Sequence, residues 1–160
     1  MVYWGIVIAV LLADQLSKLA VMGSLSLFET IPVIPGFFNL TFVVNRGAAF
    51  SLLAQADASW RHPFFLTVGV VAVTALTIYY FRTCKDEPRQ ALGLPLIAGG
   101  ALGNLIDRLR MGGVVDFLDF HYAGYHWPAF NIADSAICIG VGVYMLFSFS
   151  DSGRKSKYQR

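Results

Sequence analysis

Four long apolar stretches constrain this chain more than any other feature of its sequence. They cover residues 3–22, 63–81, 91–108 and 132–149 of the 160 residues. About 20 helical residues, rising roughly 1.5 Å each, cross the hydrocarbon of a bilayer. Each stretch is therefore predicted to be a transmembrane helix, and the expected fold class is an all-α polytopic membrane protein.

Composition supports this prediction and limits the number of domains. Hydrophobic residues make up 56% of the chain and charged residues only 14%, and the mean hydropathy is +0.60. Soluble domains are markedly more charged. No linker, repeat or low-complexity tract divides the sequence, so residues 1–160 are expected to form one domain.

The segment between the first two apolar stretches, residues 24–62, is not a plain loop. Its FFNLTFVVN run has the β-branched and aromatic residues of a strand, and Asn45, Arg46 and Gly47 follow as a turn. The neighbouring apolar residues 31–38 have two open interpretations: a surface for the membrane interface or a lipidic ligand, or a cap packed on the helix ends.

Polar side chains interrupt the apolar stretches at a few points. Asp14 and Lys18 are four residues apart, which predicts an ion pair on one helix face. The third stretch ends with Asn104, Asp107 and Arg108. Ionisable groups at membrane depth usually face a bundle interior or a cavity, so these residues are candidates for a functional site.

Two aspartates are the best candidates for catalysis. Asp116 and Asp134 each interrupt an apolar run, on opposite flanks of one loop. Two carboxylates in a partly desolvated pocket do not both ionise cheaply, which suits one to activate water and the other to polarise a carbonyl. Alternatively, Asp134 lies three residues after Asn131 and would serve only as part of a helix N-cap.

Other chemistries have weaker support in the sequence. His121, His126, Asp116 and Asp119 could supply metal ligands, but no HExxH or cysteine-rich spacing accompanies them. No GxSxG motif indicates a serine nucleophile. A proton-coupled carrier would also use membrane carboxylates, yet four helices are few for one and no inverted repeat is visible.

The basic residues predict the orientation. Seven lie in the second loop and the C-terminal tail, against four on the opposite side. The seven are Arg82, Lys85, Arg89, Arg154, Lys155, Lys157 and Arg160, and the four are Arg46, Arg61, Arg108 and Arg110. Both termini are therefore expected in the cytoplasm, which brings the polar groups together near the outer surface. The basic tail suits anionic lipid headgroups better than nucleic acid.

Five motifs, spread in order over nearly the whole chain, resemble those of one family. They are DQLSK at 14–18, NRGAAFS at 45–51, GNLIDR at 103–108, VVDFLDF at 114–120 and FNIADS at 130–135. In these motifs the chain resembles the bacterial lipoprotein signal peptidases, also called signal peptidase II, which are small aspartic proteases of the inner membrane. The resemblance implies four helices and a small extramembrane β cradle over the site.

The resemblance also assigns roles to residues. It implies that Asp116 and Asp134 are the catalytic dyad. It implies that a further set lines or supports the site, namely Asp14, Asn45, Gly47, Asn104, Arg108 and Asn131. Lys18 and Asp107 join this set as candidates because they lie within the same motifs.

The substrate that the resemblance implies is a prolipoprotein whose cysteine carries diacylglycerol, cut on the N-terminal side of that cysteine. Acyl chains would hold this cysteine at the outer headgroup level, where the aspartates are expected to converge. Membrane lipids are expected as further partners and nucleic acid is not. No cofactor or metal is expected, and the protein is expected to act as a monomer.

Overall fold

The computed structural model describes residues 1–48 and 52–158, with side chains described as far as Phe149. Residues 49–51 of the NRGAAFS motif, Arg160 and the side chains of the other three basic residues in the tail therefore lie outside the described part.

Four long helices form the body of the molecule. They are α1 (Val2–Ser24), α2 (Ala58–Thr83), α4 (Gly93–Met111) and α5 (Ile132–Tyr158), with a single turn, α3 (Pro88–Ala91), between α2 and α4. Among the described residues, three segments are long and apolar enough to cross a membrane: 2–24, 58–83 and 132–149. Helix α4 differs from these because three charged residues lie near its end, at Asp107, Arg108 and Arg110.

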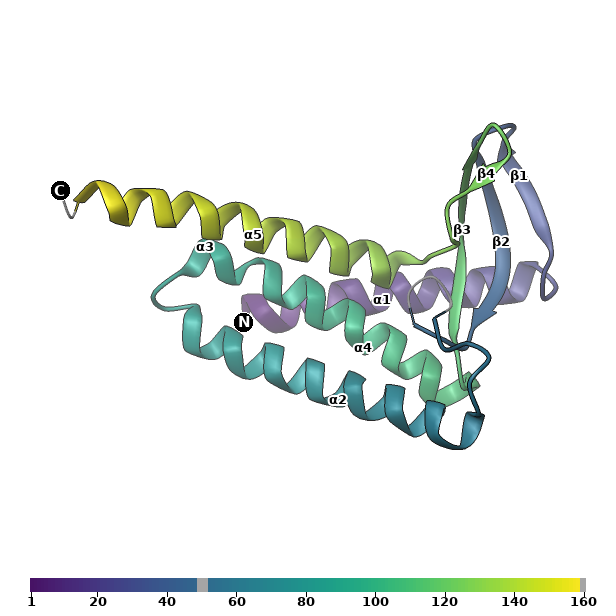
Figure 1. Cartoon of the computed structure of the whole chain (residues 1–160), viewed down its shortest axis with the longest axis horizontal. Coiled ribbons are helices and arrows are strands. Elements are labelled where there is room, and N and C mark those ends of the chain that lie inside the picture. Colours follow the sequence, from purple (N-terminus) through teal and green to yellow (C-terminus); the bar gives the residue numbers. More distant parts are fainter. Residues whose placement is uncertain (49–51, 159–160) are drawn as a thin grey trace.

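Helix α4 lies at the centre of the bundle and packs against α1, α2 and α5 (Figure 1). Two glycines of α4 permit this close packing. A side chain at Gly100 would overlap the carbonyl oxygen of Ala133 in α5, and a Cβ at Gly103 would lie 2.5 Å from Oδ2 of Asp14 in α1. These glycines let the backbone of α5 and the side chain of Asp14 in α1 approach α4 closely at the level of the polar residues.

A small antiparallel sheet covers one end of the bundle (Figure 1). Its strands, in spatial order, are β1 (Thr30–Ile34), β2 (Phe38–Asn45), β3 (Val114–Tyr122) and β4 (Tyr125–His126). Strand β2 confirms the strand predicted from the FFNLTFVVN run. Strand β3 leaves α4 through Gly112, whose φ of 68° is the left-handed conformation that glycine adopts readily at helix ends.

Strand β3 joins the sheet to the helices. Its Phe117 packs in one buried cluster with Val21 of α1 and with Leu25, the residue that follows α1. Leu40 pairs with Leu118 and Val43 with Asp116, so β2 carries one extra residue between these pairs. Such a bulge bends a strand and re-aims its side chains. The sheet is thus bent where Asp116 lies.

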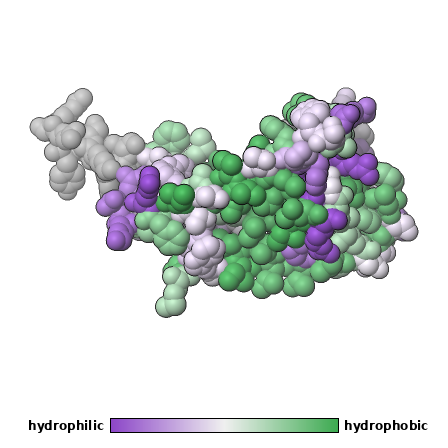
Figure 2. All heavy atoms as spheres, turned by 90° about the horizontal axis from the view of Figure 1, so that it is seen from below, coloured by the Kyte–Doolittle hydropathy of each residue, from purple (hydrophilic) through white to green (hydrophobic). Residues whose placement is uncertain are grey.

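The surface indicates how the molecule sits in a membrane. Figure 2 shows a hydrophobic face over the helices, with hydrophilic atoms gathered toward both ends. In β1 and the turn after it, Ile31, Val33, Ile34 and Phe37 are each 45–50% exposed. Their exposure favours the interface interpretation of residues 31–38 over a cap packed on the helix ends.

Candidate active site

A buried ion cluster lies between α1 and α4. Lys18 Nζ lies 2.8 Å from Asp14 Oδ2, which confirms the predicted pair, and 2.7 Å from Asp107 Oδ2. It also donates to Asn104 Oδ1 at 3.0 Å. Lys18 is 1% exposed and Asp14 0%. Buried charges of this kind are tolerated only when they are paired and hydrogen-bonded, as these are.

The same cluster holds two backbone segments. The backbone N–H of Ala133 donates to Asp14 Oδ1 at 2.9 Å, and that of Val115 donates to Asp107 Oδ2 at 3.1 Å. Ala133 and Val115 directly precede Asp134 and Asp116. The ion cluster thereby fixes the start of α5 and of β3, the two elements that carry the candidate catalytic aspartates.

Asp116 lies in β3 and is 4% exposed. Its Oδ1 accepts a 2.8 Å hydrogen bond from the side-chain amide of Asn131, which is itself fully buried. That amide also donates to the carbonyl of Val115 at 3.1 Å. Asn131 is therefore fixed against β3 and presents a donor to Asp116.

Asp134 lies in the first turn of α5 and forms a capping box with Asn131. The backbone N–H of Asp134 donates to Asn131 Oδ1 at 3.0 Å, and the backbone N–H of Asn131 donates to Asp134 Oδ2 at 3.3 Å. The predicted capping role is confirmed, but it accounts for only one carboxylate oxygen. The other, Oδ1, accepts a 2.8 Å hydrogen bond from Asn104 Nδ2.

Electrostatics distinguish Asp116 from an ordinary aspartate. Burial, and next the negative charge of Asp134, raise the pKa of Asp116 to about 7. Hydrogen bonding to Asn131 and Asn45 and the charge of Lys18 oppose the increase without cancelling it. A carboxyl group with this pKa is partly protonated at neutral pH, which is suitable for acid–base work.

Arg108 and Asn45 close the site on the side of the segment between α1 and α2. The guanidinium of Arg108 stacks over the ring of Phe65, 4.4 Å from its centroid, and donates to the carbonyl of Gly47 at 2.8 Å. Its charge also interacts with Asp116 and Asp134. Gly47 in turn donates its N–H to Asn45 Oδ1 at 2.9 Å. The turn at residues 45–47 is thus fixed against α4.

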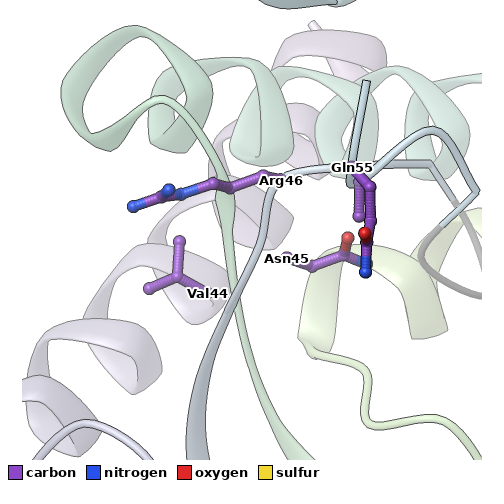
Figure 3. A pocket seen from close by; sticks show the side chains of 5 residues that line it. Val44, Asn45, Arg46 and Gln55 are labelled. Carbon is purple, nitrogen blue, oxygen red and sulfur yellow. The ribbon is translucent and has the colours of Figure 1, made fainter. Parts of the chain in front are cut away.

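A cavity of about 420 Å³ opens beside this turn, lined by Val44, Asn45, Arg46, Ala54 and Gln55. In Figure 3 the side chains of Asn45 and Gln55 lie next to each other on one side of the strand end, whereas Arg46 extends to the other side. Asn45 lines the cavity and also lowers the pKa of Asp116 by hydrogen bonding.

Asp119 lies in a separate cluster. Its Oδ2 accepts a 2.7 Å hydrogen bond from Asn39, and its Oδ1 pairs with His126 Nδ1 at 2.9 Å. The ring of His126 stacks on that of His121. Burial alone would raise the pKa of Asp119, but these hydrogen bonds and the histidines hold it below its ordinary value. Within the described residues, no three His, Cys, Asp or Glu side chains are grouped to hold a metal ion.

Gln15 is a member of the site that the sequence did not predict. Gln15 Nε2 donates to Asp14 Oδ2 at 3.1 Å and to Asp107 Oδ1 at 3.0 Å. The feature of the sequence that could have indicated a site role for Gln15 was its position beside Asp14 in an apolar stretch. Because neighbouring residues point in different directions on a helix, the sequence alone did not place it with Asp107.

The chain is similar to known proteins over most of its length. The family model for signal peptidase (SPase) II matches residues 6–150. The lipoprotein signal peptidase of Geobacter metallireducens is 48% identical over 155 residues, covering 96% of this chain and 94% of that protein. The lipoprotein signal peptidase of Shewanella loihica is 51% identical over 147 residues, covering 92% of this chain and 85% of that protein.

Solved structures have a fold similar to that of this chain. One bacterial membrane enzyme superposes with a TM-score of 0.85 at 32% identity, covering 96% of this chain and 90% of that one. A second bacterial membrane enzyme has a TM-score of 0.77 at 34% identity, with 90% of each chain covered.

Proposed function

Because this chain belongs to the signal peptidase II family, we propose that it is an aspartic endopeptidase of the bacterial cytoplasmic membrane. Its substrates are prolipoproteins whose cysteine carries diacylglycerol, and it cuts on the N-terminal side of that cysteine. The observation that carries this proposal is the link through Asn131, which donates to Asp116 and forms a capping box with Asp134.

In the proposed reaction Asp134 is ionised and Asp116 is protonated. Asp134 accepts hydrogen bonds at both oxygens, from Asn104 and from the backbone of Asn131, which favours its carboxylate form. The raised pKa of Asp116 favours its protonated form. A carboxylic acid kept neutral beside a carboxylate is the arrangement that aspartic proteases use.

The dyad then hydrolyses the peptide bond in two steps. Asp134 takes a proton from water as the water oxygen bonds to the carbonyl carbon, and Asp116 gives its proton to the carbonyl oxygen. The tetrahedral intermediate collapses by breaking its C–N bond: the amine leaves with the proton that Asp134 had taken, and one hydroxyl of the intermediate returns a proton to Asp116 as the new carboxyl group forms. The mechanism requires neither a metal nor a cofactor.

The remaining site residues have positioning roles in this proposal. Asp14, Lys18 and Asp107 hold the backbones next to the dyad. A second group orients the dyad and the turn at 45–47: Asn45, Gly47, Asn104, Arg108 and Asn131. Catalytic groups need such support, because small displacements cost large factors in rate.

We further propose that α4 is a fourth transmembrane helix and that the protein acts as a monomer. Helix α4 packs among three apolar helices, and its charged end lies at the sheet, where α5 begins. The distribution of Lys and Arg favours cytoplasmic termini and a site near the outer leaflet. Membrane lipids would then surround the helices as partners.

One experiment tests the proposed function. Purified protein in detergent is given a prolipoprotein with or without its diacylglyceryl group, and the products are identified by mass spectrometry. Cleavage immediately before the lipidated cysteine is expected, with the unlipidated form left intact. Equal cleavage of both forms would refute the proposed substrate class, and no cleavage of either would refute the activity.

A further inference from the structure

A second cavity lies away from the dyad, between the start of α2 and the end of α4. Its volume is about 290 Å³. It is lined by Arg46, Ala58, Arg61, His62, Leu109, Met111 and Gly112. We propose that this cavity binds the phosphate headgroup of an anionic phospholipid in the leaflet on the side of the sheet.

The charge of the cavity selects an anion. Arg46 and Arg61 are cationic and His62 is a nitrogen donor, whereas the described lining includes no carboxylate. Asp57 interacts with the charge of Arg61, but it is not part of the lining and its Oδ1 accepts the N–H of Ser59 as the cap of α2. Guanidinium groups bind phosphate with paired hydrogen bonds.

The cavity also has a fixed framework. Arg61 is 8% exposed, and its Nη1 donates to the carbonyls of Ala54 and Ala56 at 2.5 and 2.7 Å. The Nη1 of Arg61 is therefore occupied by these two hydrogen bonds, which also hold the rest of the guanidinium group in place. Arg46 is exposed, and its Cγ lies 3.2 Å from the place of a Cβ at Gly113. One arginine is held in place by hydrogen bonds, and the other is exposed at the cavity.

The position of the cavity matches the depth of lipid phosphates. Helix α2 has 26 residues, so its length of about 39 Å exceeds the roughly 30 Å of hydrocarbon, and its first turn extends into the headgroup region. Trp60, 45% exposed, lies in this turn as an interfacial aromatic residue. Leu109 and Met111, 63% and 37% exposed, provide an apolar edge for acyl chains.

The test measures lipid binding rather than peptide cleavage. Native mass spectrometry of the detergent-solubilised protein compares phosphatidylglycerol with phosphatidylcholine, and inorganic phosphate is added as a competitor. We expect preferential binding of phosphatidylglycerol that millimolar phosphate does not displace. Displacement by free phosphate would instead identify a phosphate-ion site and overturn the assignment to lipid.

Matched variants locate the site. His62→Gln combined with Arg46→Gln should weaken phosphatidylglycerol binding about tenfold or more, and Arg46→Lys alone should retain part of it. Arg110→Gln removes a charge from the same end of α4 but outside this cavity. The affinity of this variant for phosphatidylglycerol should therefore change less than about twofold. If Arg110→Gln and the double variant lost equal affinity for phosphatidylglycerol, general surface charge would explain the binding, and the proposal would be overturned.

Two controls separate this site from the dyad and from misfolding. Asp116→Asn should bind phosphatidylglycerol like the wild type, because Asp116 does not line the cavity. Thermal unfolding in detergent without lipid should be unchanged in Arg46→Lys. Phosphatidylglycerol should then raise the unfolding temperature of the wild type but not of the double variant, and an equal increase in both would contradict the site.

Discussion

The backbone nitrogen of Ala133, at the start of α5, lies 2.9 Å from Oδ1 of Asp14 in the middle of α1. The other oxygen of Asp14 binds Lys18, and Lys18 binds Asp107, which accepts the N–H of Val115. One lysine thus connects the residues that precede both candidate catalytic aspartates. The position of the dyad depends on charges that do not themselves take part in the proposed reaction.

Replacing Lys18 with methionine should be strongly destabilising. Asp14 and Asp107, 0% and 3% exposed, would lose their shared cation, and breaking a buried ion pair in this way costs about 3–5 kcal/mol. Thermal unfolding in detergent measures the effect, and Lys85→Met, at an exposed position outside the helices, is the control. Similar unfolding temperatures for the two variants would show that the cluster contributes little to stability.

Asp116→Asn and Asp134→Asn should each lower turnover by about 10²–10⁴-fold, the usual contribution of a general acid or base. Asparagine keeps the shape of aspartate and removes only the titrating group. Asp119→Asn should be much milder, because Asp119 binds Asn39 and His126 instead of the dyad. The rate of prolipoprotein cleavage by folded variants is the measurement, and three equal rates would make the carboxylates structural.

The sequence predicted local features of this site better than distant ones. The Asp14–Lys18 pair and the cap at Asn131 follow from spacings of four and three residues, and both are present. The contact of Lys18 with Asp107 depends on how two helices are rotated against each other. No local pattern in one helix contains that information.

Strand β3 shows a second limit of the sequence. Its run VVDFLDF was recognised as a motif, but no strand was predicted there. The first four residues of β3 are all buried, so polar and apolar residues do not alternate as in a half-exposed strand. Strand β2 was predictable because its β-branched and aromatic residues precede a clear turn.

Treatment with EDTA should leave turnover unchanged. Two carboxylates suffice to activate water in the proposed mechanism, and His126 already pairs with Asp119. Cleavage rates before and after chelation, followed by addition of Zn²⁺, test this expectation. Loss of activity with EDTA and its return with zinc would contradict the dyad mechanism and direct attention to His121 and His126.

Both termini and Lys85 should face the cytoplasm, with Asn45 and Tyr122 outside. The test uses single cysteines at positions 45, 85 and 122 in a background without Cys84 and Cys138, labelled by a membrane-impermeant reagent from each side of the membrane. Labelling of position 45 only from the cytoplasmic side would invert the proposed orientation and place the site on the wrong face for an exported substrate.

The raised pKa of Asp116 should appear in both stability and activity. Folding raises this pKa from 3.8 to about 7, so the folded protein keeps the proton to higher pH than the unfolded chain does. The free energy of unfolding should therefore fall as pH increases from about 4 to 7, by at most about 4 kcal/mol from this group. Asp116→Asn removes the titration, so the wild type should lose stability relative to this variant over that range.

The same ionisation should limit catalysis at alkaline pH. If Asp116 must donate a proton, the cleavage rate should decline above about pH 7, and ionisation of Asp134 should set the acid limb of a bell-shaped profile. Cleavage rates and thermal unfolding are measured together across the pH range, so that loss of fold is not mistaken for loss of a proton. A rate governed by a single ionisation throughout, in a protein that remains folded, would contradict a dyad that shares one proton.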